Sequence, residues 1–188
     1  MPRRSHLRTA VALTLAGLVV SACGSTTPRA APTVIPTPRV TPPATPLPAV
    51  RIAQFKPAPG SASACQTIMR NLPTALNSQW RRTTTGSRFA AAWGKPATVL
   101  RCGIPEPKTF NKYSSCLTTN GIDWYLEGDI PPMGDTPPPG ALTVTTVYRH
   151  PVVQVVVPNH YGTQGPSTAM AQLTSVINAH TTASRRCL

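Results

Sequence analysis

The sequence predicts an α+β fold: a small antiparallel sheet with an N-terminal and a C-terminal helix, stapled by two disulfides. Three observations favour it. Strand-like runs lie between two helical patterns. Four cysteines share one part of the chain with all three tryptophans and all four tyrosines. Proline, with 23 residues, is densest before residue 60. We therefore expect a signal peptide (1–22), a disordered Pro-rich tether (23–60) and a folded domain (61–188).

The N-terminus has the pattern of an export signal. Met1–Arg8 is positively charged, and Thr9–Val20 is apolar but too short to span a bilayer, which takes about 20 residues. Val20-Ser21-Ala22-Cys23 then resembles a bacterial lipobox. Its cysteine thiolate would accept the lipid. We expect a lipoprotein whose Cys23 carries acyl chains, palmitate among them, at the extracytoplasmic face of the cell membrane. An ordinary signal peptide with a chance cysteine, or an uncleaved anchor, is the alternative.

The expected tether runs from Cys23 to about Gly60 and is dominated by proline, threonine and alanine. Such a stretch has no apolar period and cannot bury a core. Proline fixes φ and removes backbone donors, so an extended polyproline II chain is expected. Threonine beside proline makes O-glycosylation of this linker an open alternative to a passive spacer.

Four cysteines in an exported domain predict two disulfides, with three possible pairings. We expect Cys102–Cys116, which would close a short loop beside a hairpin, and Cys65–Cys187, which would join the two ends of the domain. A metal site is the alternative. The cysteines have no C-x-x-C spacing and the histidines are scattered, so no metal and no cofactor are expected.

The first half of the domain contains a helix, a strand and a hairpin. Apolar residues from Cys65 to Leu72 have helical spacing, and Pro73 should end that helix. Residues 98–102 are expected to form a strand. Asn120-Gly121 between residues 116–119 and 122–126 predicts a type I′ hairpin.

The second half predicts two more strands and the last helix. The strands cover residues 143–148 and 152–157, with His150-Pro151 between them. Ser167 should cap a helix in which Met170, Leu173, Ile177 and His180 share one face.

Several short blocks carry a resemblance to a known family. They are Trp93-Gly94-Lys95-Pro96, Val99-Leu100-Arg101-Cys102-Gly103, Asn120-Gly121-Ile122-Asp123-Trp124 and Tyr148-Arg149-His150-Pro151, together with the two flanking cysteines. These blocks resemble a family of actinobacterial secreted membrane lipoproteins known only as a domain of unknown function. The resemblance implies a membrane lipoprotein and implies no activity.

The charge of the chain favours anionic partners. Lys and Arg number 18 against 5 Asp and Glu. Without Arg3, Arg4 and Arg8 of the signal peptide, 15 − 5 leaves a net charge of +10. Nucleic acid is not expected, because an exported protein would seldom meet it. The candidate anion-binding residues are Arg81, Arg82, Arg88, Arg101 and Arg149. For Arg101 and Arg149, a structural ion pair with Asp123 or Glu127 is the alternative role.

No catalytic motif is present in the sequence. Asp123 and His150 could be forced into a triad, but their spacing does not recommend it, so we expect no enzyme. The sequence favours a lipid-anchored extracytoplasmic binding or interaction module of the cell envelope. Its partner would be an envelope protein, an anionic lipid or a wall polymer. The alternative is a small-molecule or lipid-binding domain with an apolar pocket between sheet and helices, and the distant alternative is a cell-wall hydrolase.

Overall fold

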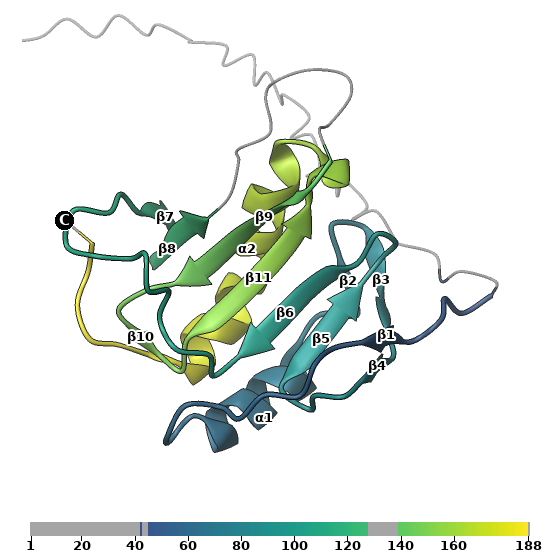
Figure 1. The fold of residues 1–188 in the computed structure, drawn as a ribbon, viewed down its shortest axis with the longest axis horizontal. Helices are drawn as coiled ribbons and strands as arrows, with labels where there is room; N and C mark the ends of the chain where they lie inside the picture. Colours follow the sequence, from purple (N-terminus) through teal and green to yellow (C-terminus); the bar gives the residue numbers. More distant parts are fainter. Residues whose placement is uncertain (1–41, 43–44, 128–138, 188) are drawn as a thin grey trace, which may run out of the picture. The chain divides into compact units, whose positions relative to one another are not determined.

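The computed structural model describes residue 42, residues 45–127 and residues 139–187, so the expected signal peptide, Cys23 and most of the tether lie outside the described residues. An eight-stranded antiparallel sheet has the order β2-β3-β5-β6-β11-β9-β8-β7. Two helices cover one face of it (Figure 1). The α+β class and the antiparallel pairing are confirmed, although the sheet is larger than expected.

The remaining strands form two small additional sheets. β1 pairs in parallel with β4, and β10 pairs antiparallel with β12. The elements are β1 (Val50–Arg51), α1 (Ala62–Asn71), β2 (Ala75–Leu76), β3 (Gln79–Arg82), β4 (Thr84–Thr85), β5 (Ala90–Trp93), β6 (Thr98–Cys102), β7 (Leu117–Thr119), β8 (Ile122–Glu127), β9 (Ala141–Thr146), β10 (Arg149–His150), β11 (Val153–Pro158), a 3-10 turn (Asn159–Tyr161), α2 (Gln164–His180) and β12 (Thr182–Ala183).

Both expected helices form, but the second begins earlier than predicted. α1 buries Cys65, Ile68 and Met69 and ends before Pro73, as expected. α2 begins at Gln164, ahead of Ser167, so the predicted Ser167 cap is wrong. Pro166 lies in the first turn, where a missing backbone N–H costs nothing. The hydroxyl of Ser167 instead donates to the carbonyl of Gln164 at 3.0 Å.

The expected strands of the sheet are confirmed, with shifts of one or two residues at their ends. Asn120 (φ 47°) and Gly121 (φ 84°) connect β7 to β8 with the two positive φ values that a type I′ turn requires. Three strands of the eight-stranded sheet were not predicted: β2, β3 and β5. β2 has two residues, and β5 is Ala-Ala-Ala-Trp, which lacks the β-branched residues that mark a strand.

Alternating side chains divide the sheet into a core face and an open face. On the core face the fully buried Trp93 and Trp124 pack with residues of both helices, as expected for core tryptophans. The opposite face carries half-buried polar side chains, among them Arg101 on β6 and Gln154 on β11, which lie side by side in the register. The open face also carries the paired Val99 and Val156, so polar and apolar side chains are mixed on it; it faces the viewer in Figure 1.

Residues 50–60, which the sequence assigned to the tether, belong to the domain; we call them the crossing segment. β1 pairs with β4, Ile52 is only 3% exposed, and Phe55 packs against the core cluster. The segment then rounds the end of β6, where Ala58 N donates to Gly103 O at 2.7 Å, and enters α1. In Figure 1 it crosses in front of the sheet in blue. The expected domain boundary at residue 61 is therefore too late.

The structure has the two expected disulfides with a different pairing. Cys65 is bonded to Cys102 and Cys116 to Cys187, with Cα–Cα distances of 5.5 and 6.2 Å. The predicted pairs Cys102–Cys116 and Cys65–Cys187 are therefore wrong. The physical reason is packing: Cys102 ends β6 on the core face, where α1 buries Cys65.

The described part of the chain contains no helix that is both long enough and apolar enough to cross a bilayer.

Candidate functional site

Three of the five predicted anion-binding arginines bond to the protein itself. Arg81 donates to Met69 O at 3.1 Å, and its burial lowers its pKa. Arg82 donates to Gly94 O at 2.9 Å and twice to Pro48 O. Arg149 donates to Thr181 Oγ1 at 2.7 Å. These guanidinium groups therefore hold the fold together and offer fewer free donors to a ligand.

The expected ion pairs of Arg101 and Arg149 with Asp123 or Glu127 do not form among the described residues. The Asp123 carboxylate pairs instead with Arg186, at 2.8 Å. Glu127 accepts a hydrogen bond from Thr109 at 2.7 Å.

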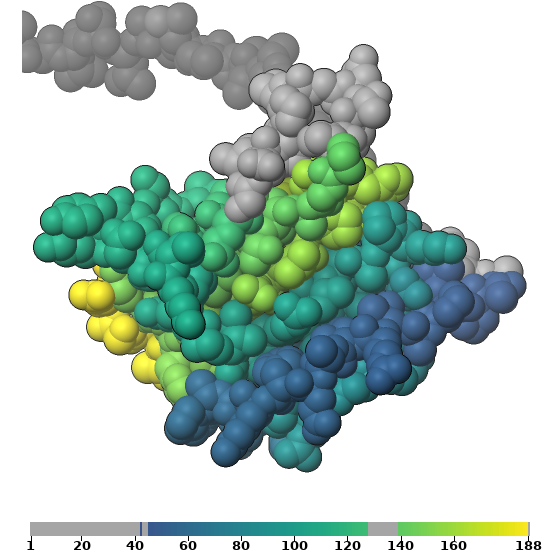
Figure 2. Space-filling model, in the orientation of Figure 1, coloured from purple at the N-terminus to yellow at the C-terminus, as the bar shows by residue number. Residues whose placement is uncertain are grey.

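The other two arginines, Arg88 and Arg101, line two different cavities beside the crossing segment. Residues 54–57 and the loop 86–89 line an open surface cavity of about 590 Å³ that includes Arg88. A second cavity, of about 260 Å³, includes Arg101 and Gln154 from the open face. Gln54, Phe55 and Lys56 line both cavities. We call the two cavities together the basic groove; Figure 2 shows the face of the molecule that the crossing segment, in blue, lies across.

The cations of the basic groove are not neutralised by any carboxylate in the part of the chain that the structure describes. No Asp or Glu is among the described residues that line the two cavities. Within residues 45–127 and 139–187, Lys56, Arg88 and Arg101 form no ion pair. Arg88 stacks over the Phe89 ring at 4.9 Å, and Arg101 has one long hydrogen bond, of 3.5 Å, to Gln154. Most of their donors are therefore available to an anionic group.

A glycine lets the crossing segment come close to the neighbouring loop. Gly86 has φ +95°, and a Cβ there would lie 1.9 Å from Ile52 O. Any side chain at this position would push the segment away and reshape the larger cavity. The strand β4 ends at Thr85, so the loop that carries Arg88 departs from the segment directly after this contact.

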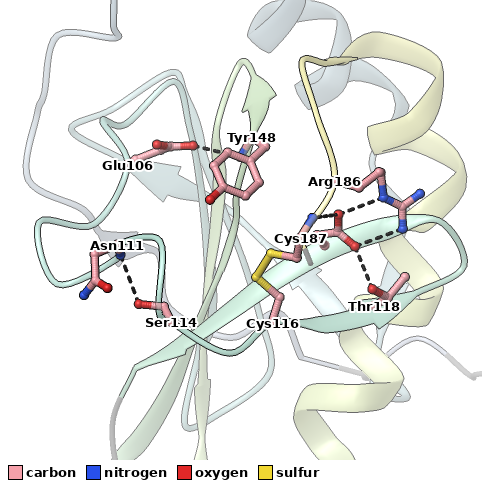
Figure 3. The surroundings of a disulfide bond; sticks show 9 residues. Glu106, Asn111, Ser114, Cys116, Thr118, Tyr148, Arg186 and Cys187 are labelled. Carbon is pink, nitrogen blue, oxygen red and sulfur yellow. Dashed lines mark hydrogen bonds and ion pairs between the residues drawn. A yellow bond between two sulfur atoms is a disulfide. The ribbon is translucent and has the colours of Figure 1, made fainter.

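The C-terminal tail (residues 181–187) contributes to a second charged cluster, in which the protein itself pairs the charged groups. Asp123, 4% exposed, accepts hydrogen bonds from Arg186 Nε, Arg186 Nη2, Thr118 Oγ1 and Cys187 N at 2.6–3.0 Å. Burial alone would raise the pKa of Asp123, but these hydrogen bonds and the charge of Arg186 lower it overall. Figure 3 shows this cluster beside the Cys116–Cys187 disulfide. All charges in it are matched, which indicates a structural role.

The Asp123–His150 arrangement considered from the sequence does not form. His150 Nε2 lies 3.4 Å from Ser61 Oγ, while Asp123 is engaged by Arg186, Thr118 and Cys187. Ser61 is fully buried, so its hydroxyl is not accessible to a substrate. A third cavity, of about 300 Å³, contains His150 and Glu106, whose carboxylate accepts from Tyr148 N at 2.8 Å. The described residues contain no cluster of three or more metal-ligating side chains.

Sequence reasoning missed Lys56, Gln54 and Gln154. Lys56 and Gln54 were hidden by the proline-rich composition of their segment. Gln154 could have been found: it lies in a strand of valines, and strand alternation places it on the face opposite Val153 and Val155.

The chain belongs to the family described as protein of unknown function (DUF3515), which matches residues 8–185. No curated protein and no solved structure matches the sequence.

Proposed function

We propose that this protein is a non-catalytic, lipid-anchored binding module of the cell envelope, whose basic groove binds an anionic partner. Cys23 would carry the lipid at the extracytoplasmic face of the cell membrane, in keeping with the actinobacterial lipoproteins that the sequence resembles. The partner would be an envelope protein, an anionic lipid or a wall polymer, without a cofactor.

One observation carries the proposal: Lys56, Arg88 and Arg101 line the basic groove, and no carboxylate among the described residues lines it with them. Lys56 and Arg88 are exposed and Arg101 is half-buried, so their like charges repel one another and a bound anion would relieve that repulsion. Arg82 and Arg149, by contrast, use their donors in hydrogen bonds to other residues of the protein. An anion in the groove would complete the hydrogen bonding of its cations.

The alternatives have weaker support. A lipid pocket between sheet and helices would need space where Trp93, Trp124 and Leu173 are fully buried in one packed cluster. The cavities described above lie at the surface instead. A hydrolase would need an accessible nucleophile beside a base, and Ser61, beside His150, is buried.

Crosslinking capture from intact cells of the native host tests the proposed binding. The protein with Lys56→Glu, Arg88→Glu and Arg101→Glu should lose its crosslinked partner. The control carries Arg70→Glu, Lys108→Glu and Lys112→Glu, which are exposed cations outside the two cavities with the same change in charge. Equal recovery of the partner by both variants would rule out the groove as the binding site.

A separate experiment tests the proposed anchor. Cys23→Ala should release the protein into the medium, because the acyl chains are then missing. Retention in the membrane fraction after a carbonate wash would contradict lipid anchoring and would leave the groove proposal untouched.

A further inference from the structure

The backbone of the crossing segment makes no hydrogen bond with the described part of the chain in the stretch that lines the two cavities. Ile52 N donates to Thr85 O at 2.9 Å, and Ala58 N donates to Gly103 O at 2.7 Å. Between these two points, the backbone groups of residues 53–56 make no hydrogen bond with any described residue. The stretch is therefore fixed at both ends, while the groups between them are unpaired.

This stretch is also fixed in its middle. Phe55 is half-buried and packs against the core cluster, whereas its neighbours Gln54 and Lys56 are exposed. A segment that is held in place and has unpaired N–H and C=O groups resembles the edge of a sheet, onto which another chain can add as a strand. The pairing of β1 with β4 ends where the larger cavity begins, so an added strand would continue an existing ladder.

The cations beside this backbone favour an added strand that carries acidic side chains. Arg88 lies in one cavity, Arg101 lies in the other, and Lys56 lines both. In an added strand, side chains alternate between two faces, so acidic residues at alternate positions could reach these cations while the main chain pairs. A phosphate polymer could satisfy the cations, but it has no regular N–H donors for the carbonyl groups of residues 53–56.

We propose that residues 53–56 bind an extended acidic peptide segment of a partner protein by strand addition, with Lys56, Arg88 and Arg101 pairing its carboxylates. This inference rests on the proposed function, because it uses the same cations, and it names the partner as a peptide. Main-chain pairing supplies the affinity and the three cations select for acidic sequences.

The test uses the full-length protein in detergent and three probes. The first is a short peptide in which glutamate alternates with threonine and valine. The second is the same peptide with N-methyl groups on alternate backbone nitrogens, which keeps the charges and removes hydrogen-bond donors. The third is inorganic polyphosphate. We expect the first peptide to bind about tenfold more tightly than the second, because two or more backbone hydrogen bonds are lost.

The outcomes separate the two proposals. Equal binding of both peptides overturns strand addition and leaves anion binding in place. Tight binding of polyphosphate with no binding of either peptide also overturns strand addition and supports a polymer as the partner. If none of the three probes binds, both proposals fail.

A pair of variants tests the same inference from the protein side. Gln54→Pro removes one backbone N–H from the unpaired stretch, and Gln54→Ala keeps it while removing the same side chain. Both variants lose the Gln54 side chain, so they are compared with each other: Gln54→Pro should bind the peptide about tenfold more weakly than Gln54→Ala does, whereas the two variants should bind polyphosphate within about twofold of each other. Equal peptide affinity of the two variants would overturn the inference. If Gln54→Pro does not fold, the N-methylated peptide still decides.

Discussion

The crossing segment and the C-terminal tail are both non-helical stretches that carry cations, yet they use their polar groups in opposite ways. In the tail, Arg186 and the N–H of Cys187 bond to Asp123, and Ser184 N donates to Tyr148 O at 2.8 Å. The crossing segment is held by the apolar side chains Ile52 and Phe55, and Lys56 has no partner among the described residues. Net charge cannot separate a structural cation from an available one, whereas the number of unsatisfied donors can.

The largest expected effect comes from releasing the tail. Cys116→Ala with Cys187→Ala opens a loop that spans a sequence separation of 71 residues and should lower the free energy of unfolding by about 4 kcal/mol. Denaturant unfolding under non-reducing conditions measures this loss. A loss below about 1 kcal/mol would mean that the polar contacts of Arg186 and Ser184 hold the tail without the disulfide.

Ile52→Ala tests whether the crossing segment belongs to the domain. Ile52 is 3% exposed, so its truncation should lower the free energy of unfolding by about 3 kcal/mol. Leu47→Ala is the matched control, because Leu47 is 37% exposed and should change stability by less than about 0.5 kcal/mol. Equal, small effects of both substitutions on the free energy of unfolding would mean that residues 50–60 are part of the tether and not of the folded domain.

Asp123→Asn tests the matched charges of the tail. It replaces the charged acceptor of four hydrogen bonds and should cost on the order of 2 kcal/mol at neutral pH. The pKa of Asp123 is lower in the folded protein than its ordinary value of 3.8. Its stabilising contribution is therefore present above pH 3.8 and is lost as the pH falls through the folded-state pKa.

Thermal unfolding from neutral to acidic pH measures this contribution. The difference between wild type and Asp123→Asn should shrink as the pH falls below 3.8. A difference that does not change with pH would show that the carboxylate charge is not what holds the tail.

The smallest effect on stability is expected from Lys56→Ala. Lys56 is exposed and unpaired within the described part of the chain, so the free energy of unfolding should change by less than about 0.5 kcal/mol. Binding of an anionic probe should weaken in the same variant. A clear loss of stability would contradict the view that this side chain serves a ligand rather than the fold.

Rules that concern neighbouring residues in the sequence, such as turn residues and proline positions, correctly predicted the elements that depend on those residues alone. Asn120-Gly121 specified its hairpin, Pro73 ended α1, and the run of β-branched residues over 152–157 marked β11. Failures came where the structure depends on contacts distant in sequence. Loop-length arguments could not show that α1 places Cys65 against the end of β6, so the pairing was wrong although the presence of two disulfides was right.

The candidate site was only partly predictable for a related reason. Sequence analysis named Arg88 and Arg101 together with three arginines that bond to the protein, because composition shows a cation but not its neighbours. Lys56 was missed because Ile52 and Phe55 are single apolar anchors in a proline-rich stretch and make no periodic pattern. Only the packed structure shows that these anchors bring a basic side chain between two cavities.

The order of the disulfides along the chain has a consequence for biogenesis. Cys65–Cys102 closes before Cys116 begins the second bridge, so the two covalent loops follow one another and do not interlock. A chain that crosses a membrane with its N-terminus first would present Cys65 and Cys102 to an oxidant before the other pair emerged. If Cys23 carries the proposed lipid and its thiol is therefore blocked, oxidation in order of emergence would produce the native bridges directly, without an isomerase to correct them.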